Sequence, residues 1–133
     1  LTVDDYHRYH YCDAGTLVEG WSIDGVLHTV GPMSQGIPVY HENQREVSIL
    51  QMEQFGACIQ IEVGALLVGK IHNHKQEAFL RGEEKGYFDY GGSTIILLFQ
   101  AGRVKIDADI LEQSAKQNET KVLFGEKIGE TLC

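Results

Sequence analysis

Residues 91–99 read GGSTIILLF, a glycine pair followed by a serine, a threonine and an uninterrupted apolar run. The β-branched and leucine side chains of residues 94–99 predict a strand. The glycine pair predicts a tight turn directly before that strand, because glycine has no Cβ to clash in a strained backbone conformation. In such a turn the Ser93 hydroxyl can approach the Gly92 carbonyl closely, so the bond between them is a candidate site of self-cleavage. The alternative is an ordinary glycine turn between two strands.

Short segments with a period of two, or rich in β-branched residues, recur along the rest of the chain, and this favours strands over helices. They lie at residues 16–19, 26–30, 47–50, 57–63, 66–71 and 104–106. Asp24-Gly25 predicts a hairpin turn between the first two segments. Fifteen glycines fit the bends and bulges of a compact β structure.

One segment, residues 108–117, predicts a helix, and Asp107 is placed to cap its amino end. The narrow stripe expected to face inward consists of Ile110, Leu111, Ser114 and Ala115. The predicted fold class is therefore mainly β (α+β). We expect packed antiparallel β sheets with one short helix near the carboxy end, in a single domain over residues 1–133.

Composition excludes several classes of protein. Nineteen acidic side chains against eleven basic ones give a formal charge of -8, and no basic stripe is present to bind nucleic acid. Cys12, Cys58 and Cys133 lack the paired spacing of a zinc site or a disulfide framework. The longest apolar runs fall far short of the roughly 20 residues that span a bilayer.

A second informative block, Asp5-Tyr6-His7-Arg8-Tyr9-His10, lies near the amino end. Further blocks follow at residues 28–33 (HTVGPM), 42–45 (ENQR), 63–71 (VGALLVGKI), 119–122 (ETKV) and 125–129 (GEKIG). In this order and spacing, together with the Gly-Gly-Ser-Thr motif, they resemble the phosphatidylserine decarboxylase family. Members of that family cut their own chain at a Gly-Ser bond.

The resemblance implies both an activity and a cofactor. The chain would be cut between Gly92 and Ser93, giving a β chain (1–92) and an α chain (93–133). Ser93 would become a covalent pyruvoyl group, which forms a Schiff base with the substrate amine and accepts electrons when carbon dioxide leaves. The implied enzyme is a pyruvoyl-dependent carboxy-lyase that converts phosphatidylserine to phosphatidylethanolamine and carbon dioxide.

His7 and His10 are the candidate proton carriers, because histidine titrates near neutral pH. In the family, one histidine of this block belongs to an Asp-His-Ser cleavage triad and the other serves decarboxylation; we assign His10 to cleavage and His7 to decarboxylation. The alternative is that both only make local hydrogen bonds. His72 and His74 lie at alternate positions, but no third ligand is evident, so no metal site is predicted and solvated histidines at a strand end are favoured.

Two departures from the family pattern bear on activity. The triad aspartate comes from a motif upstream of the histidine block, and nothing in this chain matches it. The chain also begins at Leu1 without methionine, so we expect an amino-terminal part of the catalytic domain to be missing. In addition, Gly31 stands where the family usually carries asparagine.

The resemblance also implies partners and a location. We expect a phospholipid substrate at a membrane surface, association of the cleaved α and β chains, and a homo-oligomer. The expected location is peripheral, on the cytoplasmic face of a bacterial cell membrane. Two alternatives stay open, namely a pyruvoyl-dependent decarboxylase of a soluble amino acid and a non-catalytic β scaffold of the same fold.

Overall fold

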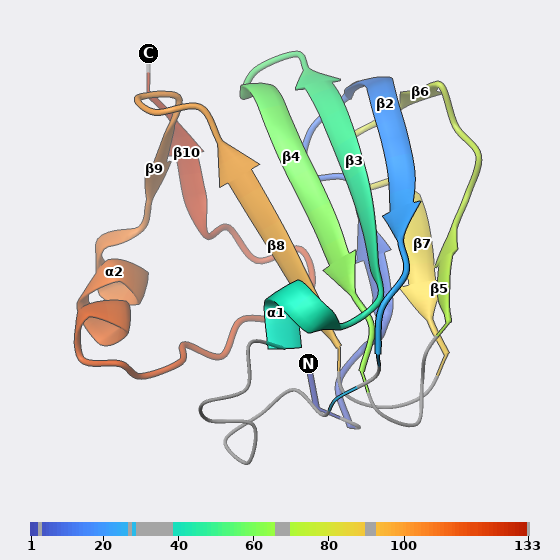
Figure 1. The fold of residues 1–133 in the computed structure, drawn as a ribbon. Helices are drawn as coiled ribbons and strands as arrows, with labels where there is room; N and C mark the ends of the chain where they lie inside the picture. The colour runs from blue at the N-terminus through green and yellow to red at the C-terminus, as the bar shows by residue number, and fades with distance from the viewer. Residues whose placement is uncertain (3, 27, 29–38, 66–69, 90–92, 133) are drawn as a thin grey trace.

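The computed structural model describes residues 1–2, 4–26, 28, 39–65, 70–89 and 93–132. The predicted mainly β fold is confirmed: antiparallel sheets dominate, accompanied by two helices (Figure 1). The elements in chain order are β1 (Arg8–His10), β2 (Gly15–Ile23), α1 (Val39–Glu42), β3 (Arg45–Met52), β4 (Gly56–Val63), β5 (Ile71–Asn73), β6 (Ala78–Phe79), β7 (Glu84–Phe88), β8 (Thr94–Phe99), β9 (Val104–Ile106), α2 (Ala108–Ala115) and β10 (Gly129–Thr131).

The larger sheet has five strands in the order β6-β2-β3-β4-β8. Strand β8 has the predicted bounds and pairs antiparallel with β4, with Val63 opposite Thr94 and Cys58 opposite Phe99. Because side chains alternate along a strand, Cys58 and every second residue after it in β4 face the same side. That side is turned toward the smaller sheet.

The smaller sheet has three strands in the order β1-β7-β5 and lies behind the larger one in Figure 1. Its register shifts between Tyr9, which pairs with Gly86, and His10, which pairs with Glu84. This bulge leaves Lys85 as the extra residue of β7, and the Lys85 side chain is buried.

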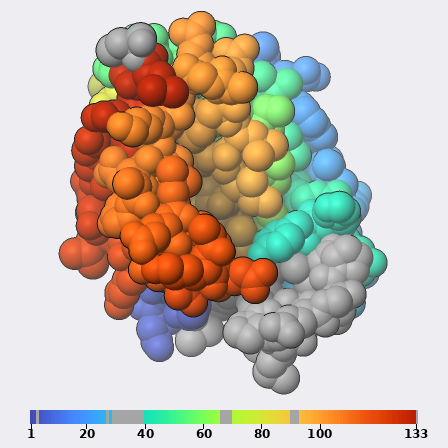
Figure 2. Space-filling view, turned by 90° about the vertical axis from the view of Figure 1, so that its left-hand side faces the viewer, coloured from blue at the N-terminus to red at the C-terminus, as the bar shows by residue number. Residues whose placement is uncertain are grey.

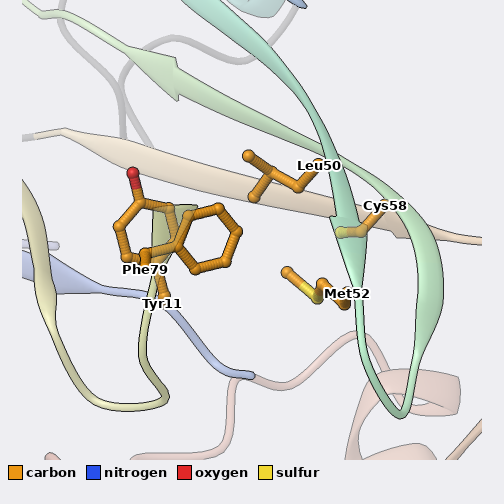
Figure 3. Packing of buried hydrophobic residues seen from close by; sticks show 5 residues of the cluster. All are labelled: Tyr11, Leu50, Met52, Cys58 and Phe79. Carbon is orange, nitrogen blue, oxygen red and sulfur yellow. The ribbon is translucent and has the colours of Figure 1, made fainter. Parts of the chain in front are cut away.

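The apolar core brings together side chains from β3, β4, β6 and the segment that follows β1 (Figure 3). It consists of Tyr11, Leu50, Met52, Cys58 and Phe79. The rings of Tyr11 and Phe79 stack with centroids 3.7 Å apart. Burial raises the pKa of Cys58 to about 12, so this thiol is neutral and acts as a small apolar residue.

The carboxy-terminal part adds the antiparallel pair β9-β10 and helix α2, which lies at the surface, at the left edge of Figure 1 and toward the viewer in Figure 2. Asp107 occupies the N-cap position, but its side chain makes no capping hydrogen bond. The predicted inward stripe is wrong, since α2 has no buried residue and Leu111 is 53% exposed. No helix in the described part of the chain is long and apolar enough to cross a membrane.

One further prediction needs correction, one helix was not predicted, and one predicted strand lies mostly outside the described residues. The predicted hairpin of residues 16–19 and 26–30 is wrong for its described residues, because β2 pairs with β3 and β6, and Val26 forms a parallel bridge with Asn43. Residues 27, 29 and 30 lie outside the described residues. A second helix, α1, was not predicted. Of the predicted strand 66–71, only residues 70 and 71 are described, and Ile71 begins β5.

Candidate active site

Ser93 lies immediately before β8 and is buried, with 1% of its surface exposed. Its backbone pairs in both directions with Leu1: the Ser93 amide donates to the Leu1 carbonyl at 3.2 Å, and the Leu1 nitrogen donates to the Ser93 carbonyl at 2.8 Å. The next residue, Thr94, begins β8 and pairs with Val63 of β4. The predicted cleavage partner Gly92 lies outside the described residues.

His7 contacts Ser93 from the smaller sheet. Its carbonyl accepts a hydrogen bond from the Phe88 amide at 3.0 Å, and its ring meets the Phe88 ring edge-on. The Nδ1 atom of His7 lies 3.3 Å from Oγ of Ser93. The Nε2 atom lies 2.8 Å from the carbonyl oxygen of Thr2, which can only accept. Nε2 therefore carries the proton in the neutral ring, and Nδ1 is free to accept the proton of the serine hydroxyl.

His10 lies at the end of β1, beyond the bulge, and makes no hydrogen bond to Ser93 in the described part of the chain. Its ring stacks on Tyr6, with centroids 6.1 Å apart, and packs against Phe124 at 4.5 Å. Its Nδ1 atom is buried and has no hydrogen-bond partner among the described residues. The structure thus joins Ser93 to His7 and leaves a polar atom of His10 unpaired.

A buried polar network next to the site was not predicted. Lys85 Nζ donates to both carboxylate oxygens of Glu62 at 2.9 Å, and to Oδ1 of Asn73 at 2.9 Å. Gln60 and Asn73 donate further hydrogen bonds to the Glu62 carboxylate, at 2.9 and 3.2 Å. The Tyr9 hydroxyl donates to Asn73 at 3.2 Å, and burial raises the pKa of this phenol. Gln60 and Glu62 lie at alternate positions of the predicted strand 57–63, and this spacing is a sequence signal for polar side chains on one face of that strand.

His72 and His74 lie on the outer side of the smaller sheet, beside Tyr87. His72 contacts Asp89 and His74 contacts Glu84, each at 2.8 Å. Hydrogen bonds from His74 and Arg8 hold the pKa of Glu84 below its usual value. The described residues contain no group of three or more potential metal ligands.

Comparison with known proteins gives the same family as the motifs. The family model described as "Phosphatidylserine decarboxylase" matches residues 1–130. No solved structure matches the chain.

Three clostridial relatives illustrate the similarity. The "Phosphatidylserine decarboxylase proenzyme 2" of Clostridium acetobutylicum is 59% identical over 132 residues, which are 98% of this chain and 45% of the relative. The "Phosphatidylserine decarboxylase proenzyme" of Clostridium botulinum is 47% identical over 136 residues, which cover 99% of this chain and 46% of the relative. The protein of the same name from Clostridium tetani is 45% identical over 138 residues, which cover 100% of this chain and 46% of the relative. The chain therefore spans about half the length of the curated relatives that it matches.

Proposed function

The chain belongs to the phosphatidylserine decarboxylase family, and on this premise we propose that it forms the self-cleaving, catalytic part of a pyruvoyl-dependent decarboxylase that converts phosphatidylserine to phosphatidylethanolamine and carbon dioxide. The observation that carries the proposal is the contact between Ser93 Oγ and His7 Nδ1, which joins the two motifs of the family across 86 residues of chain. The names of the relatives support the substrate and the proenzyme character.

Self-cleavage begins at the Ser93 hydroxyl. Oγ attacks the Gly92 carbonyl carbon, the bond from this carbon to the Ser93 nitrogen breaks, and an ester replaces the amide. Loss of the Ser93 α-proton then expels Gly92 as a carboxylate and leaves dehydroalanine. Water converts dehydroalanine to the pyruvoyl group and releases ammonia. A base must take the hydroxyl proton, and His7 Nδ1 is oriented to accept it.

The pyruvoyl group would supply an electron sink for the loss of carbon dioxide from an amine-bearing substrate. Its ketone carbon derives from Cα of Ser93, so His7 lies where a proton must be delivered during turnover. This supports the assignment of His7 to decarboxylation. The same contact also supports a part for His7 in cleavage, and only separate assays of the two stages divide these roles.

The assignment of His10 to cleavage stays a proposal, and its support is not a contact with Ser93. Its buried Nδ1 atom lacks a hydrogen-bond partner among the described residues. A buried ring nitrogen without a partner is costly, and a carboxylate is the partner that would both satisfy it and fix the tautomer of the ring. The family resemblance implies an aspartate in that role.

We further propose that the enzyme binds its substrate at a membrane surface, on the cytoplasmic face of a bacterial cell membrane. We also propose that the cut α and β chains remain together and that the enzyme is a homo-oligomer. These proposals rest on family membership and on the phospholipid named in the relatives.

The test uses the full-length protein that contains this chain and combines an intact-mass measurement with an assay of decarboxylation. Intact-mass measurement should show a fragment ending at Gly92 and a fragment starting with a pyruvoyl group. Labelled carbon dioxide should be released from phosphatidylserine in mixed micelles. An uncut chain would favour a scaffold, whereas a cut chain that acts on free amino acids and not on the lipid would favour a soluble substrate.

A further inference from the structure

Ser93 and His7 belong to different sheets. Ser93 directly precedes β8 of the five-stranded sheet, and His7 directly precedes β1 of the three-stranded sheet. The distance between Oγ of Ser93 and Nδ1 of His7 therefore depends on how the two sheets are held against each other.

The buried Glu62 carboxylate bridges these sheets. Glu62 lies on β4, opposite Ile95 of β8, and accepts hydrogen bonds from Lys85 on β7 and from Asn73 on β5. Within the described part of the chain, these are the hydrogen bonds that directly join a strand residue of one sheet to a strand residue of the other. The bridge also lies close to the site, because Ile95 is two residues beyond Ser93 and Lys85 is three residues before Phe88, the backbone partner of His7.

Local structure forces Lys85 into this position. The bulge opposite Tyr9 and His10 leaves Lys85 unpaired in the ladder, and the lysine is only 2% exposed. At Gly86, an added Cβ would meet the His72 carbonyl oxygen and, at 2.7 Å, the Tyr9 hydroxyl, so glycine is required for Tyr9 to reach Asn73. A bulge, a glycine and two complementary charges thus build one buried bridge.

A buried ion pair is weak evidence for net stability, because desolvation of the two charges offsets their attraction. We propose that Lys85 and Glu62 are positioning residues, whose bridge holds the histidine-bearing sheet at the distance from Ser93 that self-cleavage requires. The inference rests on the proposed function, since it concerns the same cleavage step.

The test measures self-cleavage of the full-length protein, made as uncut precursor under denaturing conditions and refolded at neutral pH. The variants are Lys85→Met, which keeps side-chain length, and the isosteric pair Lys85→Met with Glu62→Gln, which leaves no buried charge unpaired. Lys116→Met is the matched control, because Lys116 makes an exposed ion pair with Glu112 on α2. Circular dichroism and melting temperature identify conditions under which each variant is folded, and the cleavage rate is measured as a function of pH.

We expect both Lys85 variants to cleave about 10- to 100-fold more slowly than the parent while folded, since a displacement of about 1 Å between reacting groups has effects of this size. The part of the cleavage rate's pH dependence that His7 causes should also become smaller, because the bridge no longer holds His7 in contact with Ser93. The control should cleave at the parental rate. Folded Lys85 variants with parental rate and pH profile would overturn the positioning role; if Lys85→Met does not fold, the isosteric pair decides. A parent protein that never cleaves would instead count against the proposed function itself.

Discussion

Ser93 and Thr94 are adjacent hydroxyl residues with opposite surroundings. Ser93 is buried next to His7, whereas Thr94 begins β8, is partly exposed and pairs with Val63. Successive side chains of a strand point to opposite faces, so only one of the two hydroxyls faces the histidine.

Replacing Ser93 by alanine should give a folded, uncut and inactive protein, because the hydroxyl that contacts His7 is lost. Thr94→Ala is the matched control and should still yield pyruvoyl enzyme, since its hydroxyl lies outside the contact with His7. Gel separation of the fragments and carbon dioxide release measure the two outcomes. Normal carbon dioxide release from Ser93→Ala would refute the assignment.

The two histidines should give separable defects, because cleavage happens once and decarboxylation happens in every turnover. We expect His10→Ala to block processing. His7→Ala should slow cleavage at least as much as the Lys85 variants do, because Nδ1 of His7 contacts the Ser93 hydroxyl. The protein that is cut should then turn over about 10²- to 10⁴-fold more slowly, the usual contribution of a positioned acid or base. His74→Ala, which removes an exposed histidine paired with Glu84, is the control. The opposite pattern would exchange the two roles, and normal behaviour of both variants would leave the mechanism without a proton carrier.

At the scale of elements, Asp13 fixes the turn between β3 and β4. This buried carboxylate accepts hydrogen bonds from the amides of Gln54 and Phe55, at 2.7 and 3.3 Å, and from Arg81 at 2.8 Å. Burial by itself would raise the pKa of Asp13, but these donors outweigh it and hold the pKa below its usual value. The ionised Asp13 therefore stabilises the fold fully when the pH is above the pKa of this carboxyl in the unfolded chain. This stabilisation is lost as the pH falls through the pKa in the folded protein.

We expect Asp13→Asn to lower the free energy of unfolding by about 1–3 kcal/mol at pH 7, because charge-assisted hydrogen bonds are lost inside the protein. The difference from the parent should shrink as pH falls from about 4, the ordinary pKa of an unfolded aspartate, toward the lowered pKa of the folded protein. Urea unfolding between pH 3 and 7 measures both effects, with the exposed Asp24→Asn as control. A difference that stays constant down to pH 3 would contradict the role of the charge.

The elements differ in how far the sequence alone predicts them, for physical reasons. Strands β8 and β9 have the predicted bounds because a run of β-branched and apolar residues is a local signal. Strand β7 was missed, since the burial of Lys85 depends on Glu62, 23 residues away. The inward stripe of α2 failed because a periodic pattern does not show whether anything packs against the helix. Ser93 and His7 were paired as candidates only through the family resemblance, because 86 residues separate them.

At the scale of the whole molecule, the proposed cut lies between two segments that remain paired. Residues 58–63 of β4 and residues 94–99 of β8 form a continuous antiparallel ladder. On the proposed cut, the first segment would belong to the β chain and the second to the α chain. Leu97 also packs against the core, while Leu98 is 50% exposed on the opposite face. The ladder and the core contact should therefore outlast the covalent link.

After cleavage, the two fragments should elute together in gel filtration under native conditions and separate only in denaturant. Leu97→Asp should weaken this association, because it places a charge against the apolar core. Leu98→Asp, on the opposite face of the same strand, is the matched control and should retain it. Separation of the parental fragments in native buffer would contradict the prediction.

The ladder between β4 and β8 also means that the chain has to fold before the proposed cut. In the uncut precursor the two strands meet by an intramolecular reaction, at the high effective concentration that the connecting chain provides. Once the link is cut, their reunion after denaturation becomes bimolecular and depends on dilution. On the proposed cleavage, the mature protein is expected to persist by slow unfolding and not by repeated refolding, so its lifetime would be a kinetic property inherited from a precursor that no longer exists.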